Sequence, residues 1–456
     1  MANDLPVKVS PLNNLTPDKF KTFEKIIYTI FFFLFSEEFV FVFAPVFRNA
    51  ILRNMVFALS GDPHANVIQT VQFTWAYIVL PLFLHCVFVF TILRFLAQPQ
   101  LLKRSVHALW KSGILVLLGL ATLSLLWSVL PIITLQELLH LFELTLIGLY
   151  ISQRFSLEEI IDLLVIVFFS VGIFSLLAIW LNPRQSIHPG GEWRGIYTWK
   201  NFLGRFMALG NMSAVVYWLF NRAISKRIFA VALFVLTAVL IFFSRSTTSL
   251  GLVTLIYSAL ILLVVWKKWL GQTPAWLRWG LAGLAVFALA FSAWQFNNFL
   301  GLLNKTVSLE SRFTLWGILW EPFQQRPWLG FGYGAYWGQF PKGLIPPGPG
   351  WDQLKAFHAH NGYFDVALTL GVVGLIIFLV VLALAWKRTL QNYSDNKLPI
   401  LLWPCMALAH ITLSNLAYSL GLEFPLFFWV LFVIVCCVPL RIGPNQPVSL
   451  PQQTTT

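Results

Sequence analysis

Charged residues and cysteines are scarce in this chain of 456 residues. Only 11% of the residues are charged, with 18 acidic side chains against 31 lysines and arginines, while 58% are hydrophobic. Because about a quarter of the residues of a soluble protein are charged, this composition excludes an ordinary soluble protein. The four cysteines lie within apolar runs, without the spacing of a metal site or of a disulfide framework. We expect them to be small apolar fillers.

Long apolar runs recur from one end of the chain to the other. Many are close to 20 residues long, the length that a helix needs to cross the hydrocarbon core of a bilayer. We therefore predict an all-α polytopic integral membrane protein with about twelve transmembrane helices. The predicted spans cover residues 26–47, 71–97, 112–130, 134–151, 159–181, 201–221, 228–244, 247–266, 277–297, 361–385, 398–418 and 424–440.

The distribution of lysine and arginine predicts how these spans are oriented. If the N-terminus is cytoplasmic, nearly every inner loop carries a basic cluster, as the positive-inside rule requires. Both termini are then cytoplasmic, and the net charge of +13 needs no nucleic-acid partner to explain it. The resulting parts are a cytoplasmic tail (1–25), nine transmembrane helices (26–297), one large outer loop (298–360), three further transmembrane helices (361–440) and a second cytoplasmic tail (441–456).

Three polar clusters stand where predicted helices begin at the outer surface. They read TWKNFLGR (198–205), SRSTTS (244–249) and HAHNGYFD (358–365). A helix N-terminus offers unpaired N–H groups and the positive end of the helix dipole, which suits an anion. Capping of the helix ends is the alternative use of these polar residues, and the candidates for it are Asn201, Ser246 or Thr247, and Asn361.

Several cations accompany these helix starts on the predicted outer side. Arg245 interrupts the sequence FFSRSTTS, where a charge near hydrocarbon costs several kcal/mol, so we predict a functional role for it. Arg312 stands at the start of SRFTLWGILWEPF, which we predict to be an amphipathic helix along the outer surface. The alternative is that the loop cations pair with the few acidic residues nearby, namely Glu192, Glu310, Glu321 and Asp352.

His358 and His360 could supply half of a metal site, but residues i and i+2 do not share a helix face. We therefore expect no metal and no other cofactor. A site rich in arginine and lysine that faces outward suits a lipid-linked pyrophosphate, and a histidine can accept a hydroxyl proton near neutral pH. These groups predict transfer of a glycan from a lipid pyrophosphate to an acceptor hydroxyl.

The motifs resemble a known family. His360-Asn361, nine further residues and Gly371-Val-Val-Gly374 are similar to the signature of O-antigen ligases and related polymerases. SRFTLWGILWEPFQQRPWLGFGYGAY resembles the Arg-x-x-x-Trp, Pro and Gly-x-Gly region of the same superfamily. The segments most similar to its exopolysaccharide-polymerase branch are LWSVLPIITL (126–135), WRGIYTWKNFLGR (193–205) and SRSTTSL (244–250), and the likeness extends over residues 110–385.

The resemblance implies roles for individual residues. His360 would be the base that activates the acceptor hydroxyl, and Arg245 and Arg312 would engage the pyrophosphate. One departure is Trp199, where the branch has a smaller or histidine-like residue. The residues that the resemblance and their positions suggest as lining the site are Lys200, Asn201, Arg205, Arg194, Trp316 and Asn361.

The resemblance also implies the substrates and the cellular location. The donor would be an undecaprenyl-pyrophosphate-linked oligosaccharide, and transfer would be metal-independent and inverting. The protein would lie in the bacterial inner membrane with its site and its large loop on the periplasmic face, in contact with membrane lipid and with a possible chain-length regulator or export complex.

Three functions are open. The branch likeness favours a polymerase, whose acceptor is another glycan repeat, over a ligase, whose acceptor is lipid A core. A transporter or flippase of the same lipid-linked oligosaccharide would also need a basic site, but the chain has no evident internal repeat. In each case we expect Gly371 and Gly374 to let a neighbouring helix pack closely.

Overall fold

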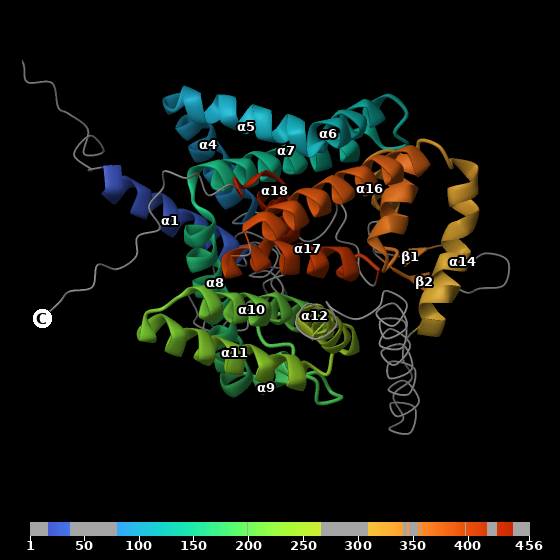
Figure 1. Cartoon of the computed structure of the whole chain (residues 1–456). Coiled ribbons are helices and arrows are strands. Elements are labelled where there is room, and N and C mark those ends of the chain that lie inside the picture. The colour runs from blue at the N-terminus through green and yellow to red at the C-terminus, as the bar shows by residue number, and fades with distance from the viewer. Residues whose placement is uncertain are drawn as a thin grey trace, which may run out of the picture.

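Figure 1 shows the fold of the chain in a computed structural model. The predicted span 277–297 and the predicted tail 441–456 lie outside the described residues, and the spans 26–47 and 71–97 lie partly outside them. The described residues are 17–36, 80–197, 199–265, 309–340, 344–345, 354–356, 358–396, 398–416 and 426–440.

The described residues are almost entirely helical. A single antiparallel pair of short strands, β1 (Leu344–Ile345) and β2 (Leu354–Lys355), lies beside α14 and the start of α16 at one end of the bundle (Figure 1). The α-helices are α1 (Pro17–Leu34), α4 (Leu80–Ala97), α5 (Pro99–Ser112), α6 (Ile114–Leu123), α7 (Pro131–Arg154), α8 (Leu157–Leu181), α9 (Pro183–Ser186), α10 (Lys200–Phe220), α11 (Ile224–Ser244), α12 (Thr247–Val265), α14 (Leu309–Gln325), α15 (Ala335–Gly338), α16 (Gly362–Asn396), α17 (Leu402–Ser414) and α18 (Leu426–Cys437), and short 3-10 turns cover Ser124–Leu126 and Pro399–Leu401.

Several of these helices are long and apolar enough to cross a membrane. Within the described residues four meet this condition by length and composition, namely α7, α8, α11 and α16, and a bent pair of helices, α4 and α5, makes a possible fifth. Shorter apolar helices include α6, α12, α17 and α18. The protein is therefore a helical, multi-pass membrane protein, whereas the predicted number of spans stays a prediction.

The helix bounds differ from the predicted spans in two places near the N-terminus. α1 begins at Pro17 instead of residue 26, so part of the predicted tail is helical. α5 was not predicted, and it leaves α4 at a bend of 111°. Pro99 at its first position and Gly113 at its end, in the left-handed conformation with φ 78°, delimit it. The sequence of α5 is too polar to form an apolar run, so apolar runs alone do not predict this helix.

A buried carboxylate joins α1 to two other helices. Glu24, which was expected in the cytoplasmic tail, is fully buried. It accepts hydrogen bonds from Arg94 Nε of α4 at 2.7 Å, from Arg154 Nε of α7 at 2.8 Å and from Tyr150 Oη of α7 at 2.7 Å. A buried charge is tolerated when it is paired and hydrogen-bonded in this way. Residues 17–25 are therefore part of the packed bundle.

The centre of the bundle is a cluster of aromatic rings around α18. Phe427 packs against Phe32 of α1, Phe168 of α8 and Phe206 of α10, with ring centroids 5.4, 6.2 and 4.9 Å apart. The described side chains of α18 are buried on every side of the helix. A helix that is apolar all round is expected at such a central place.

A break divides α16 into a short first part and a long second part. Gly371 has φ 69° and ψ −171°, a combination that is essentially restricted to glycine. The N–H groups of Val372 and Val373 donate to the carbonyls of Pro327 and Trp328, at 2.8 and 3.3 Å. The loop that follows α14 thereby replaces the helical partners of these two groups.

The same loop also satisfies the carbonyl groups on the other side of the break. The N–H groups of Phe331 and Gly332 donate to Leu368 O at 3.0 Å and to Thr369 O at 2.9 Å. The backbone groups that the break releases are thus paired, as buried backbone groups must be. The expectation that Gly371 admits a neighbouring helix was wrong, because it admits this loop.

At Gly374 the expected close approach of a neighbouring helix is not the nearest contact. The three atoms nearest to an added Cβ atom there all belong to the side chain of Leu370 in the same helix, at 2.2 to 3.4 Å.

Candidate functional site

The segment that precedes α16 lies where α14, α16 and the loop around α15 meet. Trp316 Nε1 of α14 donates to Ala359 O at 2.8 Å. Asp365 Oδ1 of α16 accepts from Ala359 N at 3.0 Å and from Trp337 Nε1 at 2.8 Å. Ala359, which lies between His358 and His360, is therefore hydrogen-bonded through both its backbone carbonyl and its backbone N–H.

His360 has an unusual backbone conformation. Its φ is 52°, and its N–H donates to His358 Nδ1 at 3.1 Å, with the two imidazole rings 4.1 Å apart. Among the described residues other than glycine, only Arg245 and His360 have a positive φ. Such conformations cost about 1–3 kcal/mol and cluster at functional sites. The two residues were selected as catalytic from the sequence for other reasons.

Both histidines are neutral at pH 7. Burial lowers the pKa of His360 to about 4, and the positive charge of Arg312 acts in the same direction. Burial lowers the pKa of His358 to about 3, with further contributions from His360, Arg205 and Arg312. Arg205 and Arg312 are thus close enough for their charges to act on this segment. A neutral imidazole is the form that accepts a proton.

Arg205 reaches this segment from α10. Its side chain is 3% exposed, and its guanidinium lies 5.5 Å from the ring centre of Phe202 and 5.1 Å from that of Phe428. Its backbone carbonyl accepts a hydrogen bond of 3.0 Å from His410 Nε2 of α17. α10, α17 and α18 together therefore fix a deeply buried cation that acts on His358.

The SRSTTS turn contacts the start of α10 directly. A Cβ atom on Gly204 would lie 2.6 Å from Ser249 Oγ and 2.9 Å from Ser246 Cβ, so only a glycine permits this approach. Ser246 Oγ accepts from Ser249 N at 3.4 Å and caps α12 as expected. Gly204 thus packs the first polar helix start against the second, and the charge of Arg205 acts on His358 in the third.

Arg245, Lys200 and Arg194 lie on the loop side of this site. Arg245 is exposed, and its Nη1 donates to Gly190 O at 3.2 Å. Lys200 Nζ forms an ion pair of 3.1 Å with Glu192 Oε1 of the loop, and Arg194 Nε of the loop donates to Gln185 O of α9 at 2.6 Å. Lys200 thus has the acidic partner that the alternative interpretation gave it. All three cations hold the loop between α9 and α10.

Three of the predicted site residues remain, namely Asn361, Asn201 and Trp316. Asn361 caps α16 as expected, since its Oδ1 accepts from the N–H groups of Tyr363 and Phe364 at 3.1 and 3.3 Å. Asn201 does not cap α10, because Trp199 occupies the N-cap position and Asn201 lies within the first turn. Trp316 supports the site by holding the Ala359 carbonyl.

The described residues hold no group of three or more His, Cys, Asp or Glu side chains that could ligate a metal. Metal-independent transfer stays a prediction.

Asp365 supports the site although the sequence did not single it out. It is 5% exposed and organises the segment through Ala359 and Trp337. An acidic residue in the first turn of a helix that is otherwise apolar was the available signal, because the helix dipole favours it there.

We expect Asp365→Ala to destabilise the protein by about 2–4 kcal/mol, since it leaves two buried N–H donors without an acceptor. Denaturant unfolding in detergent measures this loss. Asp365→Asn keeps an oxygen acceptor and should lose less. Wild-type stability for Asp365→Ala would contradict the role of this side chain.

Comparison with known proteins agrees with the motifs. Residues 230–379 match the family described as O-antigen ligase, a range that contains Arg245, Arg312, Trp316, His360 and Asn361. A stretch of 128 residues is 29% identical to the exopolysaccharide production protein ExoQ of Rhizobium meliloti (strain 1021). This match covers 26% of the chain and spans 28% of the relative's length. Residues 230–379 are therefore similar to the O-antigen ligase family, and the resemblance to the O-antigen ligase and polymerase superfamily is confirmed.

Proposed function

We propose that this protein is a membrane glycosyltransferase that transfers a glycan from a lipid pyrophosphate to a sugar hydroxyl. The donor is an undecaprenyl-pyrophosphate-linked oligosaccharide at the periplasmic face of the inner membrane, and the acceptor is a further glycan repeat. The observation that carries the proposal is the neutral His360, on which the charge of Arg312 acts, next to His358, on which the charges of Arg205 and Arg312 both act. Together these groups offer a proton acceptor and two cations for a pyrophosphate.

The proposed step is an inverting displacement. The oxygen of the acceptor hydroxyl attacks the anomeric carbon, and its proton passes to the His360 imidazole. The bond between the anomeric carbon and the pyrophosphate oxygen breaks, and its electron pair leaves with the lipid pyrophosphate. Arg312 and Arg205 stabilise the negative charge that develops on this leaving group.

Donor binding is expected to strengthen the base. A pKa of about 4 makes His360 a weak base in the free protein, partly because of the Arg312 charge. A bound pyrophosphate neutralises that charge and adds negative charge nearby, so it raises the pKa of His360 towards neutrality. His360 would accordingly become an effective base when the donor is present.

The names of the similar proteins support two versions of this reaction. The relative's name concerns exopolysaccharide production, which favours a polymerase, whereas the matching family is described as O-antigen ligase. Only the acceptor distinguishes them. A chain-length regulator or export complex would act with the polymerase.

The test uses purified protein in nanodiscs, with EDTA present and a lipid-pyrophosphate-linked oligosaccharide as the sole substrate. Separation of the products by length should show a ladder of polymers. Transfer that occurs only after lipid A core is added would indicate a ligase. Saturable donor binding without transfer to either acceptor would contradict the proposal and favour a transporter.

We expect Arg312→Gln to weaken donor use and to shift the pH profile. Loss of one charge-assisted contact should raise the donor KM by roughly 10- to 100-fold. Arg312 lowers the pKa of His360, so its removal raises this pKa, and the acid limb of kcat/KM should move from about pH 4 to higher pH. An unchanged acid limb would show that Arg312 does not act on the base.

A further inference from the structure

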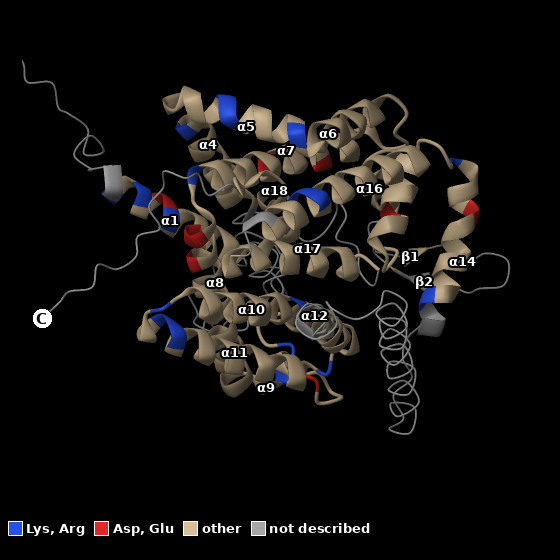
Figure 2. Cartoon of the chain, viewed as in Figure 1, with Lys and Arg blue, Asp and Glu red and all other residues tan. Residues whose placement is uncertain are grey.

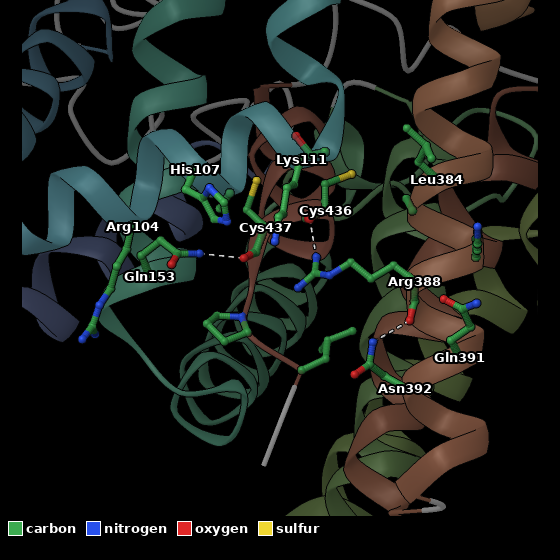
Figure 3. Close-up of a pocket in the computed structure, with 16 residues that line it drawn as sticks. Arg104, His107, Lys111, Gln153, Leu384, Arg388, Gln391, Asn392, Cys436 and Cys437 are labelled. Atoms are coloured by element: carbon green, nitrogen blue, oxygen red, sulfur yellow. Dashed lines mark hydrogen bonds between the residues drawn. The ribbon is translucent and has the colours of Figure 1, made fainter. Parts of the chain in front are cut away.

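A basic pocket lies at the end of the bundle away from His360. α5, α16 and α18 enclose a cavity of about 700 Å³, drawn in Figure 3. Arg388 lies seventeen positions after Gly371 in α16, which corresponds to about 25 Å along the helix axis. The pocket is therefore distinct from the candidate site.

The charges on its wall are all of one sign. The positive charges are those of Arg104 and Lys111 from α5 and of Lys387 and Arg388 from α16. None of the described residues that line the cavity is an aspartate or a glutamate. Figure 3 shows Lys111 and Arg388 pointing toward the same space from their two helices. A concave surface of one charge sign concentrates ions of the other sign.

The end of α18 forms a wall that does not repel an anion. Helix C-termini normally present unpaired carbonyl groups and the negative end of the dipole. Here Arg388 donates to the carbonyls of Val435, Cys436 and Val438, and Gln153 Nε2 donates to Cys437 O at 2.6 Å. These contacts cover the carbonyls and fix the positions of the surrounding side chains.

An exposed apolar stripe runs along a different face of α5 from the residues that line the pocket. Leu102, Val106 and Trp110 recur at intervals of four residues and are 38%, 56% and 69% exposed. Separate basic and apolar faces on one helix are typical of helices that lie in the headgroup region of a membrane. Exposed tryptophan is also common at that depth.

We propose that this pocket binds the phosphate of an anionic phospholipid headgroup at the membrane depth where α5 lies. Charge complementarity selects the phosphate, and the position of α5 in the headgroup region favours a lipid over a free anion. The site is independent of the proposed glycosyl transfer.

The test titrates purified full-length protein in detergent micelles with phosphatidylglycerol, and native mass spectrometry counts the bound lipid. Phosphatidylcholine with the same acyl chains and inorganic phosphate are the comparison probes. Lys111→Gln combined with Lys387→Gln should weaken phosphatidylglycerol binding by about 30-fold. Arg388 is left in place because it holds the end of α18.

Lys103→Gln combined with Arg222→Gln is the matched control, because both side chains are exposed and neither lines the cavity. This control should bind phosphatidylglycerol as the wild type does. Equal weakening in both double variants would show a general charge effect and overturn the site. Tight binding of inorganic phosphate with no preference for phosphatidylglycerol over phosphatidylcholine would overturn the lipid as its ligand.

Discussion

Replacing His360 with alanine is expected to lower the rate of glycan transfer by roughly 10²- to 10⁴-fold, the usual contribution of a general base. The imidazole is neutral at working pH, and its backbone is held in a left-handed conformation. Its neighbours Ala359 and Asn361 are fixed by hydrogen bonds. No other neutral side chain named in the proposed step can take the proton.

The measurement compares single-turnover rates at saturating donor, so that weakened binding does not enter. His358→Ala is the matched control, since it removes the same side chain two residues away and should lose much less activity. Donor binding by His360→Ala should stay close to that of the wild type. A correctly folded His360→Ala protein with full activity would exclude the base role.

Gly371→Ala is expected to cost at least about 3 kcal/mol of stability in detergent. A Cβ atom at this position would lie 2.1 Å from Trp328 O, a backbone atom that cannot move independently. The conformation with φ 69° and ψ −171° also has a high cost for any residue with a side chain. Relief of the clash would separate the loop after α14 from α16 and break the hydrogen bonds at the break.

Denaturant titration in detergent measures the free energy of unfolding of the wild type and of each variant. Gly119→Ala is the control, because a Cβ atom there meets nothing within 4 Å. Alanine favours a helix over glycine by up to about 1 kcal/mol, so this control should be neutral or slightly stabilising. If Gly371→Ala were as stable as Gly119→Ala, the backbone at the break in α16 could rearrange to accommodate a Cβ atom, which would contradict this prediction.

Apolar periodicity predicted most described helices well. The starts of α10, α12 and α16 lie within one residue of the predicted spans, since a polar cluster and an apolar run mark each boundary. The same signal failed inside α16, where GVVG reads as continuous apolar helix although Gly371 breaks it. Only the approach of a distant loop reveals that break.

The site could be predicted in its residue types but not in its arrangement. Local motifs singled out His360, Arg312 and Arg205, and the caps formed by Asn361 and Ser246 follow from the sequence. The burial of Arg205 depends on Phe428, more than two hundred residues away in the chain. Contacts of this kind leave no periodic signal.

The two ends of the bundle carry basic residues for different reasons. Figure 2 shows them on α1, α5 and the start of α11 at one end, and on α14 at the other. From the number of lysines and arginines alone, the basic residues at both ends would be interpreted as anchors at the membrane surface. The packing separates them, because Arg205 lies buried by the histidine segment while Lys103 and Arg222 stay exposed.

The burial of Glu24 has a consequence for biogenesis. Its partners belong to α4 and α7, and Arg154 is synthesised long after α1 has left the ribosome. Until then the Glu24 carboxylate has no complete set of partners. We therefore expect α1 to remain near the membrane surface, where water can solvate this carboxylate. α1 is therefore expected to reach its final place after α7 has been made, so assembly of this part of the protein does not follow the order of translation.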